Sequence, residues 1–295
     1  MSMKLKLGRL AKLATFATVL GGMTLAASSA SATPTPFTWK PSGSSPSLST
    51  AGSFTADSFS LSDFAHIHIG STGAFTETGI LQIGQFKLGA GTVTTPGLNG
   101  TSGATSYRMY ATFSGSGSIG GWSGCAGSGF CFGSFSSLTY DLWGDSGGAA
   151  TFGFTGLTPT LNPHGDTQIH LASGSLLTGC GGDCADFVTL VFSGPSSVTP
   201  GAAVSATFVP DALQPGFFIA PSITLNLQNS FTNTTGVTSI ANCSPIVAGC
   251  KEIKINNGGG NANFFTLVPE PGSLVLLGTG LIGWAGASRR KRAHA

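Results

Sequence analysis

Apolar and polar residues alternate through most of this chain, and this period of two constrains the fold more than any other feature. Residues 65–69 read Ala-His-Ile-His-Ile, so Ala65 and the two isoleucines face one way and His66 and His68 face the other. Such alternation is typical of a half-buried β-strand. Comparable alternating or continuous apolar windows begin near residues 107, 138, 169, 187, 204, 223, 253 and 264.

The composition also favours strands over helices. Gly accounts for 45 of the 295 residues, and Gly- and Ser-rich breaks separate the apolar windows as turns would. No window between residues 33 and 267 has convincing helical periodicity. We therefore predict an all-β fold, a β-sandwich or jelly roll, over residues 54–267, preceded by an extended Pro/Ser/Thr-rich leader at residues 33–53.

Charge is scarce and unevenly placed. Charged residues make up 8% of the chain, against roughly 25% in an average globular protein. Both ends are basic, whereas residues 33–267 hold five basic and ten acidic residues. Without a basic patch in the middle, nucleic acid is not an expected partner. Basic segments beside apolar runs at both ends fit a chain whose acidic middle crosses a membrane while its Lys and Arg residues stay behind.

The N-terminus has the order of a secretory signal peptide. A basic segment at residues 1–12 precedes an uncharged apolar run at residues 13–25, and Ala30-Ser31-Ala32 is a small-x-small cleavage site. We predict a signal peptide over residues 1–32, cut between Ala32 and Thr33, with the Sec translocon and signal peptidase as partners. The alternative is a transmembrane anchor, but a span needs about 20 apolar residues and this run is shorter.

The C-terminus carries the most specific motif. Val268-Pro269-Glu270-Pro271 is followed by an apolar segment at residues 272–287. Sixteen helical residues reach about 24 Å, close to the thickness of a hydrocarbon core. A basic cluster then ends the segment: Arg289, Arg290, Lys291 and Arg292. A plain tail anchor is the alternative interpretation of the apolar segment alone.

Residues 268–295 resemble the PEP-CTERM sorting signal, which places the same three elements in the same order. The resemblance implies recognition of Pro269, Glu270 and Pro271 by exosortase, a membrane-embedded enzyme. It also implies export in a Gram-negative bacterium, transient anchoring in the inner membrane with the basic cluster as stop-transfer signal, and release to the cell surface or extracellular matrix.

Six cysteines lie in the exported part and fall into close pairs. An even number of cysteines in an exported chain favours disulfides. Zinc is the alternative, but none of the spacings is the C-x2-C of a zinc ribbon. Proximity suggests these pairings: Cys125 with Cys131, Cys180 with Cys184, and Cys243 with Cys250.

One pentapeptide suggests catalysis. Gly144-Asp145-Ser146-Gly147-Gly148 surrounds the nucleophilic serine in proteases that resemble chymotrypsin. The chemistry also needs a base and an orienting carboxylate, and the upstream His66 and His68 lack the family's context. A turn at the end of a strand explains the pentapeptide equally well in a Gly- and Ser-rich chain. We predict no catalytic residue and no enzyme.

Candidate binding residues also have a structural alternative. His66 and His68 share one face of a strand and could bind a metal if a third ligand arrived, such as His164, Asp166 or His170. Because the sequence fixes no third ligand, we favour a polar strand face and predict no metal and no cofactor. Asp141 with Asp145, or Asp183 with Asp186, could bind Ca²⁺ in loops, and solvated carboxylates are the alternative. Paired carboxylates could also serve glycoside hydrolysis, which depends on their separation in space. Trp39, Trp122 and Trp143 could stack on sugar rings, and packing in the core is the alternative.

Shorter blocks resemble the flocculation-associated PEP-CTERM proteins. They lie at residues 103–113, 139–143, 214–218 and 227–232. That resemblance implies cell aggregation together with secreted exopolysaccharide. We predict an exported structural or adhesive protein of the envelope or matrix; a polysaccharide-active enzyme or a ligand-binding module on the same fold is the alternative.

Overall fold

The computed structural model describes residues 35–100, 103–125, 129–147, 150–162, 167–176, 187–194, 197–198, 202–219, 226–233 and 237–265. Most of them lie in strands and almost none in helices, so the predicted all-β class is confirmed. The alternating windows form most of the long strands, in which successive side chains point to opposite faces. These strands are β3 (Ser58–Ile69), β4 (Ala74–Leu88), β6 (Tyr107–Gly120), β7 (Gly129–Ser146), β10 (Gln168–Leu176), β11 (Phe187–Gly194), β13 (Ala202–Leu213), β15 (Asn226–Asn233), β16 (Val237–Asn242) and β17 (Lys251–Phe265).

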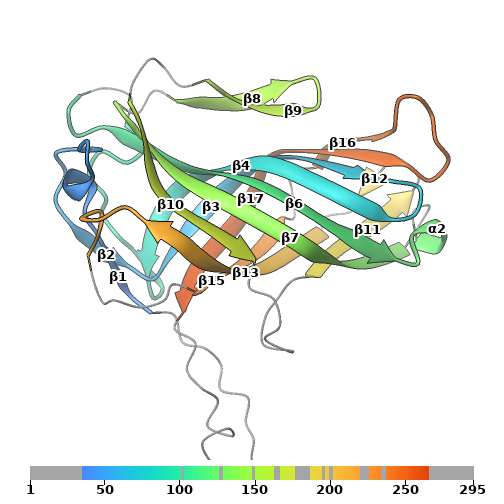
Figure 1. Cartoon of the computed structure of the whole chain (residues 1–295), viewed down its shortest axis with the longest axis horizontal. Helices are drawn as coiled ribbons and strands as arrows, with labels where there is room; N and C mark the ends of the chain where they lie inside the picture. The colour runs from blue at the N-terminus through green and yellow to red at the C-terminus, as the bar shows by residue number, and fades with distance from the viewer. Residues whose placement is uncertain are drawn as a thin grey trace, which may run out of the picture. The chain divides into compact units, whose positions relative to one another are not determined.

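One antiparallel sheet contains all of these strands, and it closes on itself (Figure 1). β3, β4, β6 and β7 pair in sequence order. β10 and β11 each pair with both β7 and β13, so they occupy one position in the ring. β15 and β16 likewise both pair with β17. β17 then pairs with β3, and the last long strand meets the first.

This connectivity corrects the predicted sandwich or jelly roll. Those folds need two facing sheets with connections that cross between them. Here each strand position pairs with the next along the chain, and the ring has no free edge between β3 and β17. Alternation of apolar and polar residues is the same in both architectures, so the sequence could not separate them. Two short strands add to the ring, β5 (Gly91–Thr92) on β4 and β12 (Ser197–Val198) on β11.

Aromatic rings fill one end of the closed sheet. A small sheet lies there, made of β1 (Phe37–Trp39), β2 (Phe54–Ala56) and β14 (Phe218–Ile219), with a 3-10 turn at Pro41–Gly43. The Trp39 side chain is 1% exposed. Its ring packs against six phenylalanine rings at centroid distances of 4.9–6.4 Å. We call this cluster the aromatic plug: Phe37, Trp39, Phe54, Phe59, Phe86, Phe217, Phe218 and Phe264.

The aromatic plug corrects the predicted leader. Residues 33–53 were predicted to be an extended leader, because they are rich in Pro, Ser and Thr. Instead, Phe37 and Trp39 are buried, and the amide of Thr35 donates to the carbonyl of Phe264 in the last long strand at 2.6 Å. The described part of this segment therefore belongs to the domain.

The opposite end carries two disulfide loops. A short helix, α2 (Trp122–Cys125), leads to the Cys125–Cys131 disulfide, and the Cys243–Cys250 disulfide closes the loop between β16 and β17 (Figure 1, right). The indole Nε1 of Trp122 donates to the carbonyl of Gly249 at 2.5 Å, so the two loops contact each other. We call this region the disulfide end.

A hairpin covers part of the outer surface of the ring. It consists of β8 (Thr151–Thr155) and β9 (Thr158–Asn162). Phe152 packs against Phe64 and Tyr110 with ring centroids 5.8 Å and 5.6 Å apart. These contacts explain why Phe64 and Tyr110 are buried although they point away from the interior.

Candidate functional site

A field of hydroxyl groups lies on the outer face of three adjacent strands, β4, β6 and β7. The strand register places them in two rows that cross the sheet. One row runs Thr76, Ser116, Ser137 and the other runs Thr78, Ser114, Thr139, from β4 through β6 to β7. All six side chains are exposed except that of Ser116, which is half-buried. We call these six residues the hydroxyl strip.

The sequence builds this strip by its period of two. Between its hydroxyl residues, the same strands direct Phe75, Leu138 and Tyr140 into the core. Gly115 makes room for this packing, because a Cβ there would lie 2.6 Å from Cδ1 of Leu138. The hydroxyl strip is therefore the outer side of a well-packed part of the ring.

Hydrogen bonds hold the strip together across β6 and β7. The hydroxyls of Ser116 and Ser137 lie 2.8 Å apart, and Thr139 Oγ1 donates to the carbonyl of Ser114 at 3.4 Å. A hydroxyl both donates and accepts, so each group keeps capacity for a further partner. The six residues offer neutral donors and acceptors on a surface without a charge of its own.

Two histidines and a glutamate border the strip on one side. The same two rows continue onto β3, where Thr76 pairs with His68 and Thr78 pairs with His66. Glu252 on β17 lies between the two rings: its Oε2 is 2.5 Å from His66 Nε2 and its Oε1 is 2.7 Å from His68 Nδ1. We call His66, His68 and Glu252 the seam cluster, because they join the first and last long strands.

An aromatic and ionic group borders the strip on the other side. Trp143 on β7 packs against His170 on β10 with ring centroids 4.8 Å apart, and its Nε1 donates to Thr112 Oγ1 at 3.3 Å. His170 Nε2 lies 3.0 Å from Asp141 Oδ1. The strip is thus flanked by titratable groups at both margins while its centre is neutral.

Ser146 does not meet a catalytic base among the described residues. Its hydroxyl donates to the carbonyl of Thr167 at 3.5 Å. It lies on β7 seven residues beyond Thr139, about 24 Å along the strand, whereas the row of His66 meets β7 at Thr139. Asp145 is buried and accepts from the amide of Ala150 at 2.9 Å. The pentapeptide therefore ends a strand, as its structural interpretation predicts.

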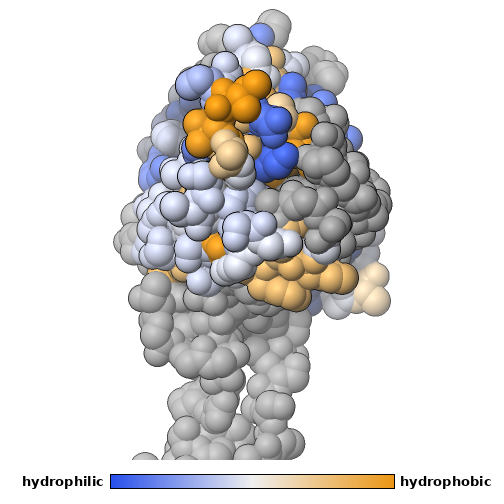
Figure 2. All heavy atoms as spheres, turned by 90° about the vertical axis from the view of Figure 1, so that its right-hand side faces the viewer, coloured by the Kyte–Doolittle hydropathy of each residue, from blue (hydrophilic) through white to orange (hydrophobic). Residues whose placement is uncertain are grey.

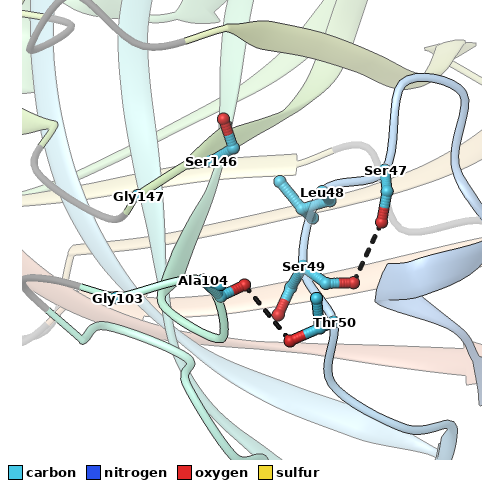
Figure 3. A pocket seen from close by; sticks show the side chains of 8 residues that line it. All are labelled: Ser47, Leu48, Ser49, Thr50, Gly103, Ala104, Ser146 and Gly147. Atoms are coloured by element: carbon cyan, nitrogen blue, oxygen red, sulfur yellow. Dashed lines mark hydrogen bonds between the residues drawn. The ribbon is translucent and has the colours of Figure 1, made fainter.

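A shallow pocket lies beside Ser146 (Figure 3). Its volume is about 350 Å³. The side chains of Ser49 and Thr50 turn to backbone carbonyls at 2.7 Å and 3.4 Å. Its described lining contains no acidic residue and no histidine: Ser47, Leu48, Ser49, Thr50, Gly103, Ala104, Ser146 and Gly147. This lining offers hydroxyl and backbone groups, not an acid–base pair.

Two carboxyl groups lie inside the ring. Asp63 on β3 and Glu77 on β4 are both buried, at 7% and 4% exposure. Burial, and to a smaller extent the nearby charge of Asp63, together raise the pKa of Glu77 from 4.5 to about 8. Glu77 therefore holds its proton at neutral pH, and it contributes to the core rather than to the outer surface.

The remaining predicted site residues have mixed outcomes. Trp39 and Trp122 are core residues, whereas Trp143 is half-buried at the margin of the strip. The pairings Cys125–Cys131 and Cys243–Cys250 are confirmed. His68, Cys243 and Cys250 come within 4.8 Å of one another, but both sulfurs belong to the disulfide and are not thiolate ligands. Other predicted residues lie outside the described residues: Ala32, Thr33, His164, Asp166, Cys180, Asp183, Cys184, Asp186, Pro269, Glu270, Pro271, Arg289, Arg290, Lys291 and Arg292.

Sequence reasoning missed Glu252 and the strip as a unit. Glu252 lies 184 residues beyond His68, and no local pattern connects them. The strip carried part of a signal, since Ser114 and Thr139 lie at polar positions of alternating windows, whereas no such window was identified over Thr76 and Thr78. What the sequence lacked was the register that aligns them.

The comparisons with known proteins agree with the C-terminal motif. The PEP-CTERM protein-sorting motif matches residues 267–291, which include Pro269, Glu270 and Pro271. No curated protein and no solved structure is found to match the chain. Among the described residues, no helix combines the length and the apolar character needed to cross a membrane. The chain therefore carries a PEP-CTERM protein-sorting motif, which indicates an exported protein that is targeted to exosortase.

Proposed function

We propose that this protein is a structural or adhesive component of the cell surface or extracellular matrix, and that it binds exopolysaccharide through the hydroxyl strip. The signal peptide would direct it through the Sec translocon, signal peptidase would cut after Ala32, and exosortase would release it from the inner membrane. Its role would be cell aggregation or flocculation.

The observation that carries this proposal is the pair of hydroxyl rows across β4, β6 and β7. A neutral polysaccharide presents hydroxyl groups at regular intervals, and it is recognised by surfaces that both donate and accept hydrogen bonds. Because strands lie about 4.8 Å apart, each row spans roughly 10 Å and could face two adjacent sugar rings. With charged residues at 8% of the chain, electrostatic repulsion between copies is weak, which supports association in a matrix.

The test is a binding experiment with exopolysaccharide purified from the producing cells. The double variant Ser114→Glu, Thr139→Glu should reduce co-sedimentation of the full chain with the polymer by about tenfold, because two adjacent carboxylates disrupt the neutral row. Thr158→Glu on β9 is the matched control, since this exposed threonine lies outside the strip. Equal binding by both variants would refute the assignment of the strip.

A polysaccharide-active enzyme is the second candidate. It is favoured by Asp141, which pairs with His170 next to Trp143 at the margin of the strip. Asp141→Asn should then abolish the release of reducing ends from the polymer while co-sedimentation persists. Release of no reducing ends by the unaltered chain leaves adhesion as the function.

A further inference from the structure

We propose that the seam cluster is a binding site for a divalent transition-metal cation, with Zn²⁺ as its probe, and that the cation links the first and last long strands of the ring. The proposal does not depend on polysaccharide binding. Its three ligands are the imidazoles of His66 and His68 and the carboxylate of Glu252.

The ligand set has the composition of a known class of zinc sites. Two histidines and one glutamate leave a fourth position for water or another ligand in a tetrahedral site. His66 and His68 are two residues apart on one strand and therefore share its outer face. Glu252 pairs directly with His68 across the β3–β17 seam, so all three side chains start from neighbouring backbone positions.

The carboxylate of Glu252 already contacts both imidazoles, each through a different oxygen. His66 Nε2 lies 2.5 Å from Oε2 of Glu252, and His68 Nδ1 lies 2.7 Å from Oε1. A carboxylate only accepts hydrogen bonds, so each ring now donates an N–H to it. In the metal-bound form each imidazole takes its other tautomer and directs a lone pair at the cation. Zinc lies about 2.0–2.2 Å from nitrogen and oxygen ligands, so both rings must turn from the separate carboxylate oxygens that they now contact toward one shared point.

Two lysines of β17 are neighbours of Glu252 in the sequence, and each ammonium group has contacts of its own. Lys254 is paired with His66 across the seam, but its Nζ lies 3.4 Å from the carbonyl of Gly156 and 4.2 Å from the centroid of Phe154. Lys251 Nζ donates to Asn242 Oδ1 at 3.0 Å. The carboxylate of Glu252 itself contacts both imidazoles.

The three ligands differ in their exposure to solvent. The side chains of His66 and His68 are 22% and 44% exposed, and that of Glu252 is 14% exposed. The open side allows a cation to enter, whereas the shielded carboxylate strengthens its attraction for the cation. Cys243 Sγ lies 3.8 Å from His68 Nδ1, but this sulfur stays in its disulfide.

The experiment measures zinc binding to the full chain, purified in mild detergent without a histidine tag and stripped by a chelator. We expect one Zn²⁺ per chain by elemental analysis after dialysis. Zinc at 100 times its Kd should raise Tm by about 5–10 °C, because it binds the folded state alone. Co²⁺ in place of zinc should give the visible absorption of a tetrahedral nitrogen and oxygen site.

The histidines of the chain supply matched controls. His66→Ala, His68→Ala and Glu252→Gln should each weaken zinc binding at least tenfold and remove the Co²⁺ absorption. His164→Ala, His170→Ala and His294→Ala should retain both. Near-ultraviolet circular dichroism without metal shows whether each variant is folded, and Glu252→Gln is the mildest change. Failure of the unaltered chain to bind zinc, or equal loss in the His170→Ala control, would overturn the proposal.

Discussion

The two ends of the closed sheet are sealed by different means. At one end the aromatic plug packs eight rings together, and Trp39 is 1% exposed. At the other, two short loops are held by the Cys125–Cys131 and Cys243–Cys250 disulfides. Apolar burial stabilises the folded state, whereas a disulfide acts mainly by restricting the unfolded chain. An end closed by disulfides needs fewer apolar contacts.

The disulfide end accordingly leaves apolar side chains in solvent. Figure 2 looks onto this end and shows orange patches separated by paler surface. Phe130 and Phe132 are 65% and 64% exposed and stack on each other, and Ile246 in the second loop is 83% exposed. The comparison predicts that damage to the two ends has unequal effects on stability.

The largest effect is expected at the aromatic plug. Trp39→Ala should lower the free energy of unfolding by about 3–5 kcal/mol, because it leaves a cavity among packed rings. Denaturant unfolding of the full chain measures the change. Trp143→Ala, at a half-buried position, is the control and should cost less; equal losses would contradict the central role of the plug.

Removal of a disulfide should have the next largest effect. Cys243→Ser with Cys250→Ser should lower the free energy of unfolding by roughly 2 kcal/mol, because the loop is short. Hydrogen exchange should speed up around residues 243–250 and 122–125, since the loops contact each other through Trp122. Faster exchange in the aromatic plug as well would show that the two ends are coupled.

The pH dependence of the free energy of unfolding should arise mainly from Glu77. Glu77 lies two residues from Phe75, near the disulfide end, and its pKa is raised from 4.5 to about 8. Between these values the folded chain holds a proton that the unfolded chain has released, so stability falls as pH rises. The free energy of unfolding should drop by about 1.4 kcal/mol per pH unit in this window.

Glu77→Gln supplies the control for this prediction. The amide does not titrate, so the pH dependence between 4.5 and 8 should flatten. Thermal unfolding at a series of pH values measures both chains. A slope that persists in the variant would assign the dependence to other groups.

The smallest effect is expected from the exposed rings of the disulfide end. Phe130→Ser and Phe132→Ser should change the free energy of unfolding by no more than about 0.5 kcal/mol, because exposed side chains contribute little. The same denaturant experiment measures it. A loss as large as that of Trp39→Ala would mean that these rings are buried against something in solution.

The sequence is sufficient to predict an all-β fold, but not that the sheet closes on itself. The alternation at Ala65, Ile67 and Ile69 is confirmed as a strand with a buried face. The two described disulfides join cysteines close in sequence, so proximity was enough to predict them. Closure depends on the pairing of β17 with β3, which joins segments almost 200 residues apart and leaves no local signal.

The arrangement of side chains on the outer surface could not be predicted from the sequence either. The polar positions of each strand were visible in the sequence, but their alignment across β4, β6 and β7 depends on register. The contact of Glu252 with His66 and His68 depends on closure itself. Trp39 was assigned to a leader because its neighbours are Pro, Ser and Thr, although tertiary packing overrides that composition.

The pairing of β17 with β3 also affects the order of folding and export. β17 ends at Phe265, and the sorting motif begins at residue 267. We expect that the ring cannot close until almost the whole domain has been exported. A chain that stops short of β17 would expose unpaired edges on β3 and β15, which invite aggregation. Completion of the fold and arrival of the sorting motif at the membrane thus become nearly simultaneous events, so that exosortase would receive chains whose domain is able to close.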